Sequence, residues 1–222
     1  MKFFLDTANL DEIRSCVDLG VIDGITTNPT LLSRESGDWR SILEKICAMV
    51  PGPISAEVIA EDTDGMLREA RDLAKIAQNI VVKIPMSRTG IQAIHVLSQE
   101  GIRTNATLVF SANQALLVAK AGGNFVSPFL GRLDDVSQEG MEVVRQIVEI
   151  YDLHGFQTEV LAASIRHPMH VVQAALAGAH IATMPSKVFE QLFHHPLTDK
   201  GIRSFQEDWK KVQARAEKAS AR

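Results

Sequence analysis

The feature that most constrains the fold is a regular alternation of short apolar runs with longer segments of helical period. Between the apolar runs, hydrophobic residues recur at intervals of three and four, as Met66, Ala70 and Leu73 do within residues 62–78. Further helices are predicted over 90–100, 111–121 and 139–155, and a short helix and an amphipathic segment, 201–219, follow the last run. The apolar runs predict eight strands, at 2–6, 20–27, 53–60, 79–85, 102–109, 124–130, 158–164 and 180–185.

Eight strands alternating with helices predict an α/β protein with a (β/α)8 fold, the TIM barrel, built as a single domain over residues 1–222. The C-terminal segment, about 201–219, is predicted to add one helix to it. The chain is slightly short for this fold, so its loops are expected to be tight. A doubly wound open sheet is the alternative, but it usually has fewer strands and an early GxGxxG loop, which this sequence lacks.

Composition excludes several classes of protein. A net charge of -4 gives no basic excess of the kind that binds nucleic acid. No run approaches the roughly 18 apolar residues of a membrane span. The amino-terminal MKFFLD is too short for the apolar core of a signal peptide, and Cys16 and Cys47 have no metal or redox spacing. We therefore expect a cytoplasmic protein with no nucleic-acid or membrane partner.

Polar residues gather where the predicted strands end, and in a barrel the carboxyl ends of the strands meet at one mouth. Charges buried there need partners, since an unpaired one costs several kcal/mol. We therefore expect Asp6, Glu57 and Lys83 to share one axial pocket. The full set of polar residues at or beside the strand ends is Asp6, Thr26, Thr27, Asn28, Glu57, Lys83, Asn105, Thr107, Ser127, Arg132, Ser164 and Arg166.

Lys83 stands out because it lies in the otherwise apolar run NIVVKIPMS. A lysine held away from water has its pKa lowered and supplies a neutral amine, the form that attacks a carbonyl to make a Schiff base. Two nearby carboxylates could move protons during that chemistry. The alternatives are that Lys83 ends an edge strand and reaches solvent, and that Asp6 and Glu57 cap the following helices.

Arg132 and Arg166 follow predicted strand ends. The planar guanidinium group of an arginine can donate two parallel hydrogen bonds to a phosphate or carboxylate. The alternative is a surface salt bridge for each, with Arg132 meeting Asp134 or Asp135. His167 and His170 have a spacing that metal ligands use, but the sequence offers no third ligand. We predict a surface pair at a helix start and no metal site.

Seven segments, in this order and spacing, resemble the transaldolases, specifically the short subfamily that also contains fructose-6-phosphate aldolase. The resemblance runs from Phe3 to about Trp209. TTNPT and VVKIP, followed by NATL about twenty residues later, are the most specific features. The segments are FLDTANLDEI, GITTNPTLL, AEVIAEDTDGM, VVKIPMSRTGIQAI, TNATLVFSANQALLVAKAG, VSPFLGRLDD and VLAASIR.

The resemblance implies a role for each site residue. Lys83 matches the Schiff-base lysine, Asp6 the acid/base for the hydroxyl proton, and Glu57 a carboxylate that acts through a water, which Thr107 helps to hold. Asn28 and Asn105 match residues that bind substrate hydroxyls, and Thr26 of TTNPT is also assigned to substrate binding. The resemblance further implies that the phosphate is bound by Arg132, Ser164 and Arg166. Ser127 and Phe129 are implied to line the pocket.

The implied reaction belongs to the pentose phosphate pathway and transfers a dihydroxyacetone unit from a ketose to an aldehyde. Sedoheptulose 7-phosphate and glyceraldehyde 3-phosphate are converted into erythrose 4-phosphate and fructose 6-phosphate, and the reaction also runs in reverse. No metal or organic cofactor is implied. The related aldolases carry glutamine at the site of Glu57 and tyrosine at that of Phe129, so transfer is expected here rather than release of free dihydroxyacetone.

A non-catalytic barrel that binds sugar phosphates is the rival of another class. It would keep Arg132 and Arg166 but would not need Lys83, Asp6 and Glu57 together. The resemblance also implies a homodecamer of paired pentamers. In the short transaldolases the last helix reaches an adjacent subunit, whereas periodicity alone leaves open packing on the chain's own barrel.

Overall fold

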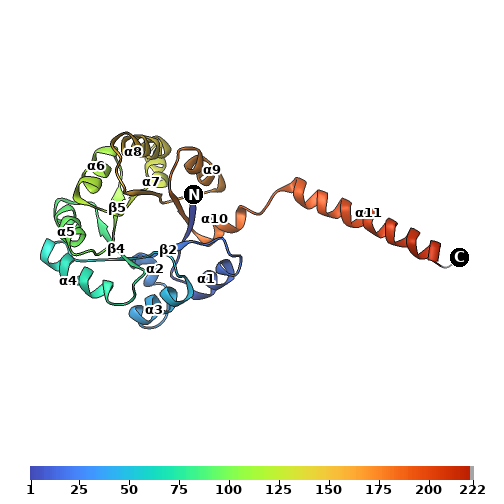
Figure 1. Cartoon of the computed structure of the whole chain (residues 1–222), viewed down its shortest axis with the longest axis horizontal. Coiled ribbons are helices and arrows are strands. Elements are labelled where there is room, and N and C mark those ends of the chain that lie inside the picture. The colour runs from blue at the N-terminus through green and yellow to red at the C-terminus, as the bar shows by residue number, and fades with distance from the viewer. Residues whose placement is uncertain (221–222) are drawn as a thin grey trace. The chain divides into compact units, whose positions relative to one another are not determined.

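The structure is a computed structural model that describes residues 1–220. Within that range, eight parallel strands follow one another around a closed barrel, and the last strand pairs with the first. Figure 1 shows the strands enclosed by a ring of helices. The predicted (β/α)8 barrel is confirmed. The strands are β1 (Lys2–Asp6), β2 (Gly24–Thr26), β3 (Ile54–Glu57), β4 (Ile80–Pro85), β5 (Thr104–Val109), β6 (Phe125–Pro128), β7 (Glu159–Ala162) and β8 (Ile181–Met184).

The helices lie between the strands, with an extra helix in two of the connections, β2 to β3 and β6 to β7, and two helices after the last strand. They are α1 (Leu10–Val17), α2 (Pro29–Leu32), α3 (Trp39–Met49), α4 (Thr63–Ala74), α5 (Arg88–Gln99), α6 (Ala112–Ala121), α7 (Leu130–Asp135), α8 (Gly140–His154), α9 (Pro168–Leu176), α10 (Ser186–Gln191) and α11 (Pro196–Ser220).

Local sequence fixes where many of these helices begin. A polar side chain accepts a hydrogen bond from a backbone N–H of the first turn, as Asp62 does from Gly65 in α4 and Ser87 from Gly90 in α5. Pro29 and Pro168 occupy first-turn positions of α2 and α9, where a proline loses no hydrogen bond. Gly122 and Gly155 end α6 and α8 in the left-handed conformation. The tight connections follow from such caps.

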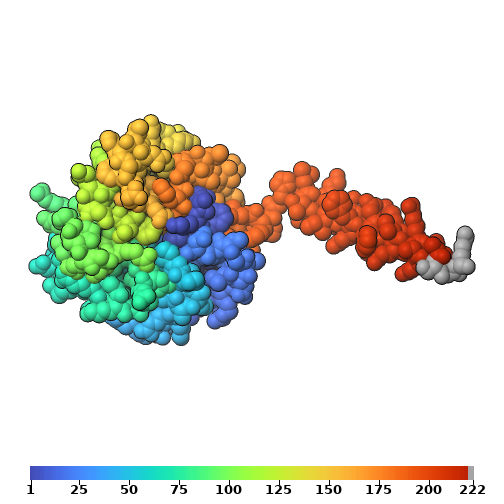
Figure 2. Space-filling model, viewed as in Figure 1, coloured from blue at the N-terminus to red at the C-terminus, as the bar shows by residue number. Residues whose placement is uncertain are grey.

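The barrel interior is built by alternation along each strand. Phe4, Val81, Phe125 and Leu161 pack together inside, each two residues before a pocket-facing position of its strand. Gly24 makes room for this packing, because a Cβ there would lie 2.6 Å from the ring of Phe4. Figure 2 shows the blue surface of the first residues next to the orange surface of residues near 180, where the barrel closes.

Two elements begin four or more residues away from their predicted first residue. The second strand begins at Gly24 rather than at residue 20, because Gly20 turns the chain with φ 73° and Asp23 bonds to both backbone groups of Phe3. The last helix begins at Pro196 rather than at 201, since a proline at the start and Asp199 in the first turn both favour a helix N-terminus.

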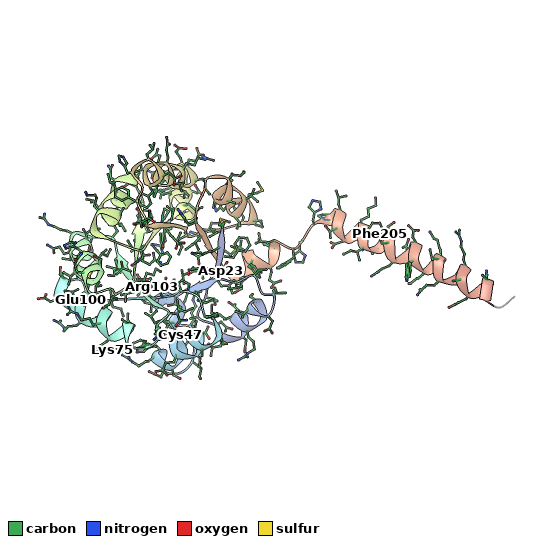
Figure 3. All side chains as sticks on the ribbon, in the orientation of Figure 1. Asp23, Cys47, Lys75, Glu100, Arg103 and Phe205 are labelled. Carbon is green, nitrogen blue, oxygen red and sulfur yellow. The ribbon has the colours of Figure 1, made fainter. Side chains whose placement is uncertain are left out.

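The chain forms two compact units, Met1–Phe189, which holds the barrel, and one that begins at Glu190 and holds α11. Along α11, apolar residues recur at three- and four-residue intervals at Ile202, Phe205, Trp209 and Val212, and all of them are exposed. We call these four the α11 apolar row; Figure 3 shows Phe205 projecting from the helix. Within the described residues, no helix has both the length and the apolar character to cross a membrane.

Candidate active site

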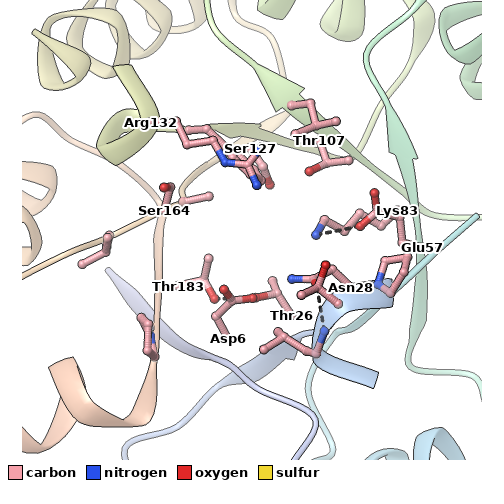
Figure 4. A pocket seen from close by; sticks show the side chains of 18 of the residues that line it. Asp6, Thr26, Asn28, Glu57, Lys83, Thr107, Ser127, Arg132, Ser164 and Thr183 are labelled. Atoms are coloured by element: carbon pink, nitrogen blue, oxygen red, sulfur yellow. Dashed lines mark hydrogen bonds and ion pairs between the residues drawn. The ribbon is translucent and has the colours of Figure 1, made fainter. Parts of the chain in front are cut away.

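A cavity of about 560 Å³ opens at the carboxyl ends of the barrel strands. Figure 4 shows side chains converging on it from several strands and from the loops that follow them. The predicted site residues that line it are Asp6, Thr26, Asn28, Glu57, Lys83, Thr107, Ser127, Phe129, Arg132, Ser164 and Arg166. The structure therefore brings together all the residues given a role in the site except Asn105; Thr27, also selected at a strand end, does not line the cavity either.

Lys83 is buried, with 4% of its surface exposed. Its Nζ lies 3.1 Å from Glu57 Oε2 and donates to the backbone carbonyl of Thr27, also at 3.1 Å. The ion pair follows from register, since Glu57 and Lys83 are paired neighbours on β3 and β4. The alternative in which this lysine ends an edge strand and reaches solvent is wrong, because a closed barrel has no edge strand.

Asp6 ends β1 on another side of the cavity and is held by a chain of hydroxyl groups. Thr26 Oγ1 donates to Asp6 Oδ1 at 2.8 Å and lies 2.6 Å from Thr183 Oγ1. A hydroxyl has one proton, so Thr183 must be the donor to Thr26. Burial raises the pKa of Asp6 above its usual range, although the charge of Lys83 and the bond from Thr26 act against this. Asp6 therefore takes up a proton more readily than an exposed aspartate.

Thr107 presents a buried hydroxyl to the cavity. In the described part of the chain its Oγ1 has no hydrogen-bond partner, which is unusual for a buried polar atom. The next residue, Leu108, has φ 58°, and the pairing of β5 with β6 shifts register there. A leucine adopts this conformation only at a cost, so the surrounding structure must hold it. The irregularity therefore lies beside a strand residue that lines the cavity with an unpartnered hydroxyl.

The two asparagines have different surroundings. Asn28 caps α2 by accepting from the N–H of Leu31 at 2.9 Å, and this leaves its amide nitrogen free to face the cavity (Figure 4). Asn105 is fully buried and, of the residues given a role in the site, is the one outside the cavity lining. It donates to Ser55 and accepts from Ser127 at 2.7 Å. The geometry thus gives Asn105 a direct role in holding Ser127, and the predicted contact with substrate stays a prediction.

Phe129 and Arg132 stack on the opposite wall. The guanidinium carbon of Arg132 lies 4.9 Å from the ring centre of Phe129, whose other neighbour is the edge-on ring of Phe110. Among the described residues, no hydrogen bond or ion pair holds the Arg132 guanidinium. The alternative, in which Arg132 forms a surface salt bridge with Asp134 or Asp135, is therefore wrong. The aromatic ring supports this cation while leaving its N–H donors available.

Arg166 is the arginine that meets an aspartate: its Nη2 lies 2.7 Å from Asp135 Oδ2, and both side chains are half-exposed. Ser164, two residues earlier, has φ 61°. Gly131 allows this segment to approach α7, because a Cβ there would lie 2.0 Å from the Ser164 carbonyl oxygen. Ser164, Arg132 and Arg166 therefore face the cavity from one side, with guanidinium donors to spare for an anion.

Sequence reasoning missed several residues that line the cavity, among them Thr183 and Arg34. Thr183 interrupts the apolar run of β8, and that interruption was a usable signal. Arg34 follows α2 in a loop, where no periodicity marks it. Arg34 adds a third arginine to a cavity whose other two arginines come from the connections after β6 and β7. Within the described residues, no cluster of three or more histidine, cysteine or carboxylate side chains could hold a metal ion.

The prediction that His167 and His170 form a surface pair is wrong for His170, which is buried. Its ring lies 3.7 Å, centre to centre, from that of exposed His167, and its Nε2 lies 3.2 Å from Asp134 Oδ2. An N-terminal position on α9 would ordinarily face solvent. Packing against α7 covers this one instead.

Comparisons with known proteins agree with this geometry. A family model described as Transaldolase/Fructose-6-phosphate aldolase matches residues 3–216. A protein named "Probable transaldolase" from Heliobacterium modesticaldum is 59% identical over 96% of this chain and 99% of its own length. A protein of the same name from Thermoanaerobacter sp. is 58% identical over 96% of this chain and 98% of its own length. Another, from Methanococcus maripaludis, is 56% identical over 94% of this chain and 97% of its own length.

Proposed function

Because this chain belongs to the transaldolase/fructose-6-phosphate aldolase family, we propose that it is a transaldolase that works through a Schiff base on Lys83. The observation that carries the proposal is the buried contact of Lys83 Nζ with Glu57, in a cavity that also holds Asp6. A merely structural lysine has no need of two carboxylates at a barrel mouth. The implied reaction moves a dihydroxyacetone unit between sugar phosphates of the pentose phosphate pathway.

The first half of the proposed reaction uses Lys83 and Glu57. At 3.1 Å, Glu57 can take a proton from Nζ, directly or through a water, and leave a neutral amine that attacks the C2 ketone of fructose 6-phosphate or sedoheptulose 7-phosphate. The adduct then loses its hydroxyl as water, with the proton returned by Glu57. The product is an iminium ion, which accepts the electron pair of the bond that breaks next.

The second half uses Asp6. Its carboxylate takes the proton of the C4 hydroxyl, the C3–C4 bond breaks, and the electron pair moves to the iminium to give an enamine. Glyceraldehyde 3-phosphate or erythrose 4-phosphate leaves. The raised pKa of Asp6 suits a group that first accepts this proton and later returns it to the oxygen of the acceptor aldehyde. The enamine attacks that aldehyde, and water releases the new ketose from Lys83.

Phosphate binding is assigned to Arg132, Ser164 and Arg166. A guanidinium fork donates two parallel hydrogen bonds to a phosphate, and both arginines have donors that the protein does not use. Figure 4 shows Arg132 and Ser164 on the side of the cavity away from Lys83 and Glu57, so the phosphate end of a sugar would lie away from the carbon that reacts with Lys83. Asn28 and Thr26 border the region between, where substrate hydroxyls would lie.

Glu57 and Phe129 favour transfer over release of dihydroxyacetone. The aldolases of this family carry a tyrosine at the site of Phe129, and its hydroxyl could orient water to protonate the enamine. Phenylalanine provides no such donor, and here its face is covered by Arg132. The enamine should therefore survive until an aldehyde arrives.

A coupled assay tests the function. Fructose 6-phosphate is supplied with and without erythrose 4-phosphate, and both glyceraldehyde 3-phosphate and free dihydroxyacetone are measured. A transaldolase consumes fructose 6-phosphate rapidly only when the acceptor is present. Equal rates with and without acceptor, with stoichiometric free dihydroxyacetone, would show the aldolase instead, and no turnover in either case would favour the non-catalytic barrel.

We also propose that the chain assembles as a homodecamer of paired pentamers through α11, in the cytoplasm. The exposed α11 apolar row supports this assembly, because a helix face of this kind is ordinarily covered by another protein surface. A second copy of the chain is the occupant we propose, in keeping with the family resemblance. Light scattering on the intact protein measures its mass directly.

A further inference from the structure

A series of hydrogen bonds lies beside the arginine side of the cavity and uses two side chains, His170 and Asp134, that have no role in the proposed mechanism. The backbone N–H of Arg166 donates to His170 Nδ1 at 3.3 Å. On the far side of the ring, Nε2 lies 3.2 Å from Asp134 Oδ2, and Asp134 Oδ1 accepts from the N–H of Gly140 at 2.9 Å. These hydrogen bonds thus connect the start of α8, the helix α7, the helix α9 and the segment that follows β7.

This arrangement fixes the state of the imidazole. A neutral ring has one donor and one acceptor nitrogen, whereas a protonated ring has two donors. Because Nδ1 accepts from Arg166 N–H, the proton of the neutral ring must lie on Nε2, where Asp134 accepts it. The carboxylate therefore selects the tautomer that can hold the Arg166 backbone.

The surroundings keep His170 in that form. Burial lowers the pKa of His170, the charges of His167 at its own helix start and Arg166 in the adjoining segment lower it further, and Asp134 on α7 opposes them. The neutral acceptor is thus favoured near neutral pH. Acidification would place a second proton on Nδ1, facing the N–H of Arg166.

The backbone held in this way is under constraint. Ser164 has φ 61°, and Gly131 lies so close that a Cβ there would be 2.0 Å from the Ser164 carbonyl oxygen and 2.8 Å from Arg166 Nε. A conformation of this kind persists only where neighbouring contacts determine it. The bond to His170 is one such contact, two residues beyond Ser164.

We propose that His170, oriented by Asp134, is a positioning residue that holds the Arg166 backbone and thereby sets the affinity of the cavity for the phosphate of the substrate. The proposal rests on the function proposed above, in which Arg166 and Ser164 bind that phosphate. His170 itself does not line the cavity. Its effect should therefore fall on the binding of phosphorylated compounds and not on the chemistry at Lys83.

Two variants separate the two ends of the ring. His170→Asn places an amide oxygen near the position of Nδ1 and can still accept from Arg166 N–H, whereas His170→Gln places an amide nitrogen near that of Nε2 and keeps only the bond to Asp134. We expect His170→Gln to raise the KM for fructose 6-phosphate roughly five- to tenfold, the loss of one hydrogen bond, with kcat little changed. His170→Asn should recover most of this loss.

The controls use ligands without a sugar phosphate. Trapping of dihydroxyacetone on Lys83 with borohydride should be the same in wild type and both variants, since no phosphate is involved. The Kd of inorganic phosphate, measured by calorimetry, should weaken in His170→Gln and not in His170→Asn. As the pH falls from about 7 to 5, the Kd of phosphate should rise more for wild type than for His170→Asn, because the asparagine cannot gain a proton. The titration of phosphate itself affects both proteins equally and so does not contribute to this difference.

Several outcomes would overturn the proposal. It fails if the two variants change the KM and the phosphate Kd equally or not at all. It also fails if His170→Gln slows dihydroxyacetone trapping as much as it weakens phosphate binding, which would indicate general damage. Absence of trapping and transfer in the wild type would refute the proposed function instead, and the phosphate Kd of the same variants would still decide the role of His170.

Discussion

The barrel mouth and the helix α11 depart from the usual distribution of residues in opposite ways. At the mouth, a lysine with 4% of its surface exposed lies against a carboxylate, whereas on α11 a phenylalanine is 77% exposed. Buried charges and exposed apolar rows both cost free energy in an isolated chain. Each is therefore a place where something outside the chain is expected to bind: a carbonyl substrate at the mouth, and a second copy of the protein on α11.

Replacing the buried lysine should produce the largest effect. Lys83→Ala should lower transfer by on the order of 10³-fold or more, because among the described residues that line the cavity Lys83 alone has an amine to form the proposed Schiff base. Mass spectrometry after borohydride treatment should detect no dihydroxyacetone adduct. Lys75→Ala removes an exposed lysine that pairs with Asp72 and should leave the adduct unchanged. A persistent adduct in Lys83→Ala would contradict the assigned nucleophile.

A charge placed in the α11 apolar row should break the assembly. The double variant Phe205→Glu/Trp209→Glu is expected to be smaller than wild type by light scattering, because two carboxylates would be buried without partners in a subunit contact. Glu207→Lys lies on the other side of the helix and is the matched control. If the double variant keeps the wild-type mass, or wild type is already monomeric, the row is not a contact between subunits.

The burial of the Asp6 carboxylate should make the free energy of unfolding depend on pH. Its pKa is raised in the folded protein, so the folded state holds its proton to higher pH than the unfolded state does. The free energy of unfolding therefore falls as pH rises from about 4, the ordinary aspartate pKa, through the raised value. Above that window the carboxylate is ionised in both states, and its burial destabilises the fold.

Asp6→Asn removes this ionisation and keeps an oxygen to accept from Thr26. At neutral pH the variant should be stabler than wild type by about 0.5–2 kcal/mol, in the range of single stabilising substitutions, while losing transfer activity. The advantage should disappear below about pH 4. Urea unfolding at several pH values measures it, and a gain that does not depend on pH would mean that the ionisation of Asp6 is not its source.

An exposed charge at the same mouth should matter least. Arg34 lines the cavity from a loop, in water, so its attraction for a phosphate is weakened by solvent. Arg34→Ala is expected to raise the KM for fructose 6-phosphate roughly two- to fivefold without changing kcat. Arg40→Ala, which removes a guanidinium stacked on Trp39, serves as the control. If Arg34→Ala lowered activity as much as Lys83→Ala, the exposure of Arg34 would not make its contribution smaller than that of buried Lys83.

Much of the candidate site could be predicted from strand alternation. Inward positions recur every second residue, so Asp6 and Glu57 at the ends of β1 and β3, and Lys83 near the end of β4, had to face the axis once the barrel closed. Asn105 shows the limit of this rule. It has the same alternation as Thr107 but is two residues earlier, in register with Lys83. The long lysine side chain reaches the cavity from that level, whereas the shorter asparagine bonds to Ser127, which itself lines the cavity.

The sequence by itself determined the succession of strands and helices, the side of each strand that faces the axis and the caps that start the helices, because all of these depend on residues within a turn or two of each other. Only the tertiary structure decided that Asp135 meets Arg166 rather than Arg132, that His170 is buried against Asp134, and that Arg34 reaches the cavity. Those contacts join residues far apart in the chain, and their distances are set by barrel closure and helix packing, which no local pattern encodes.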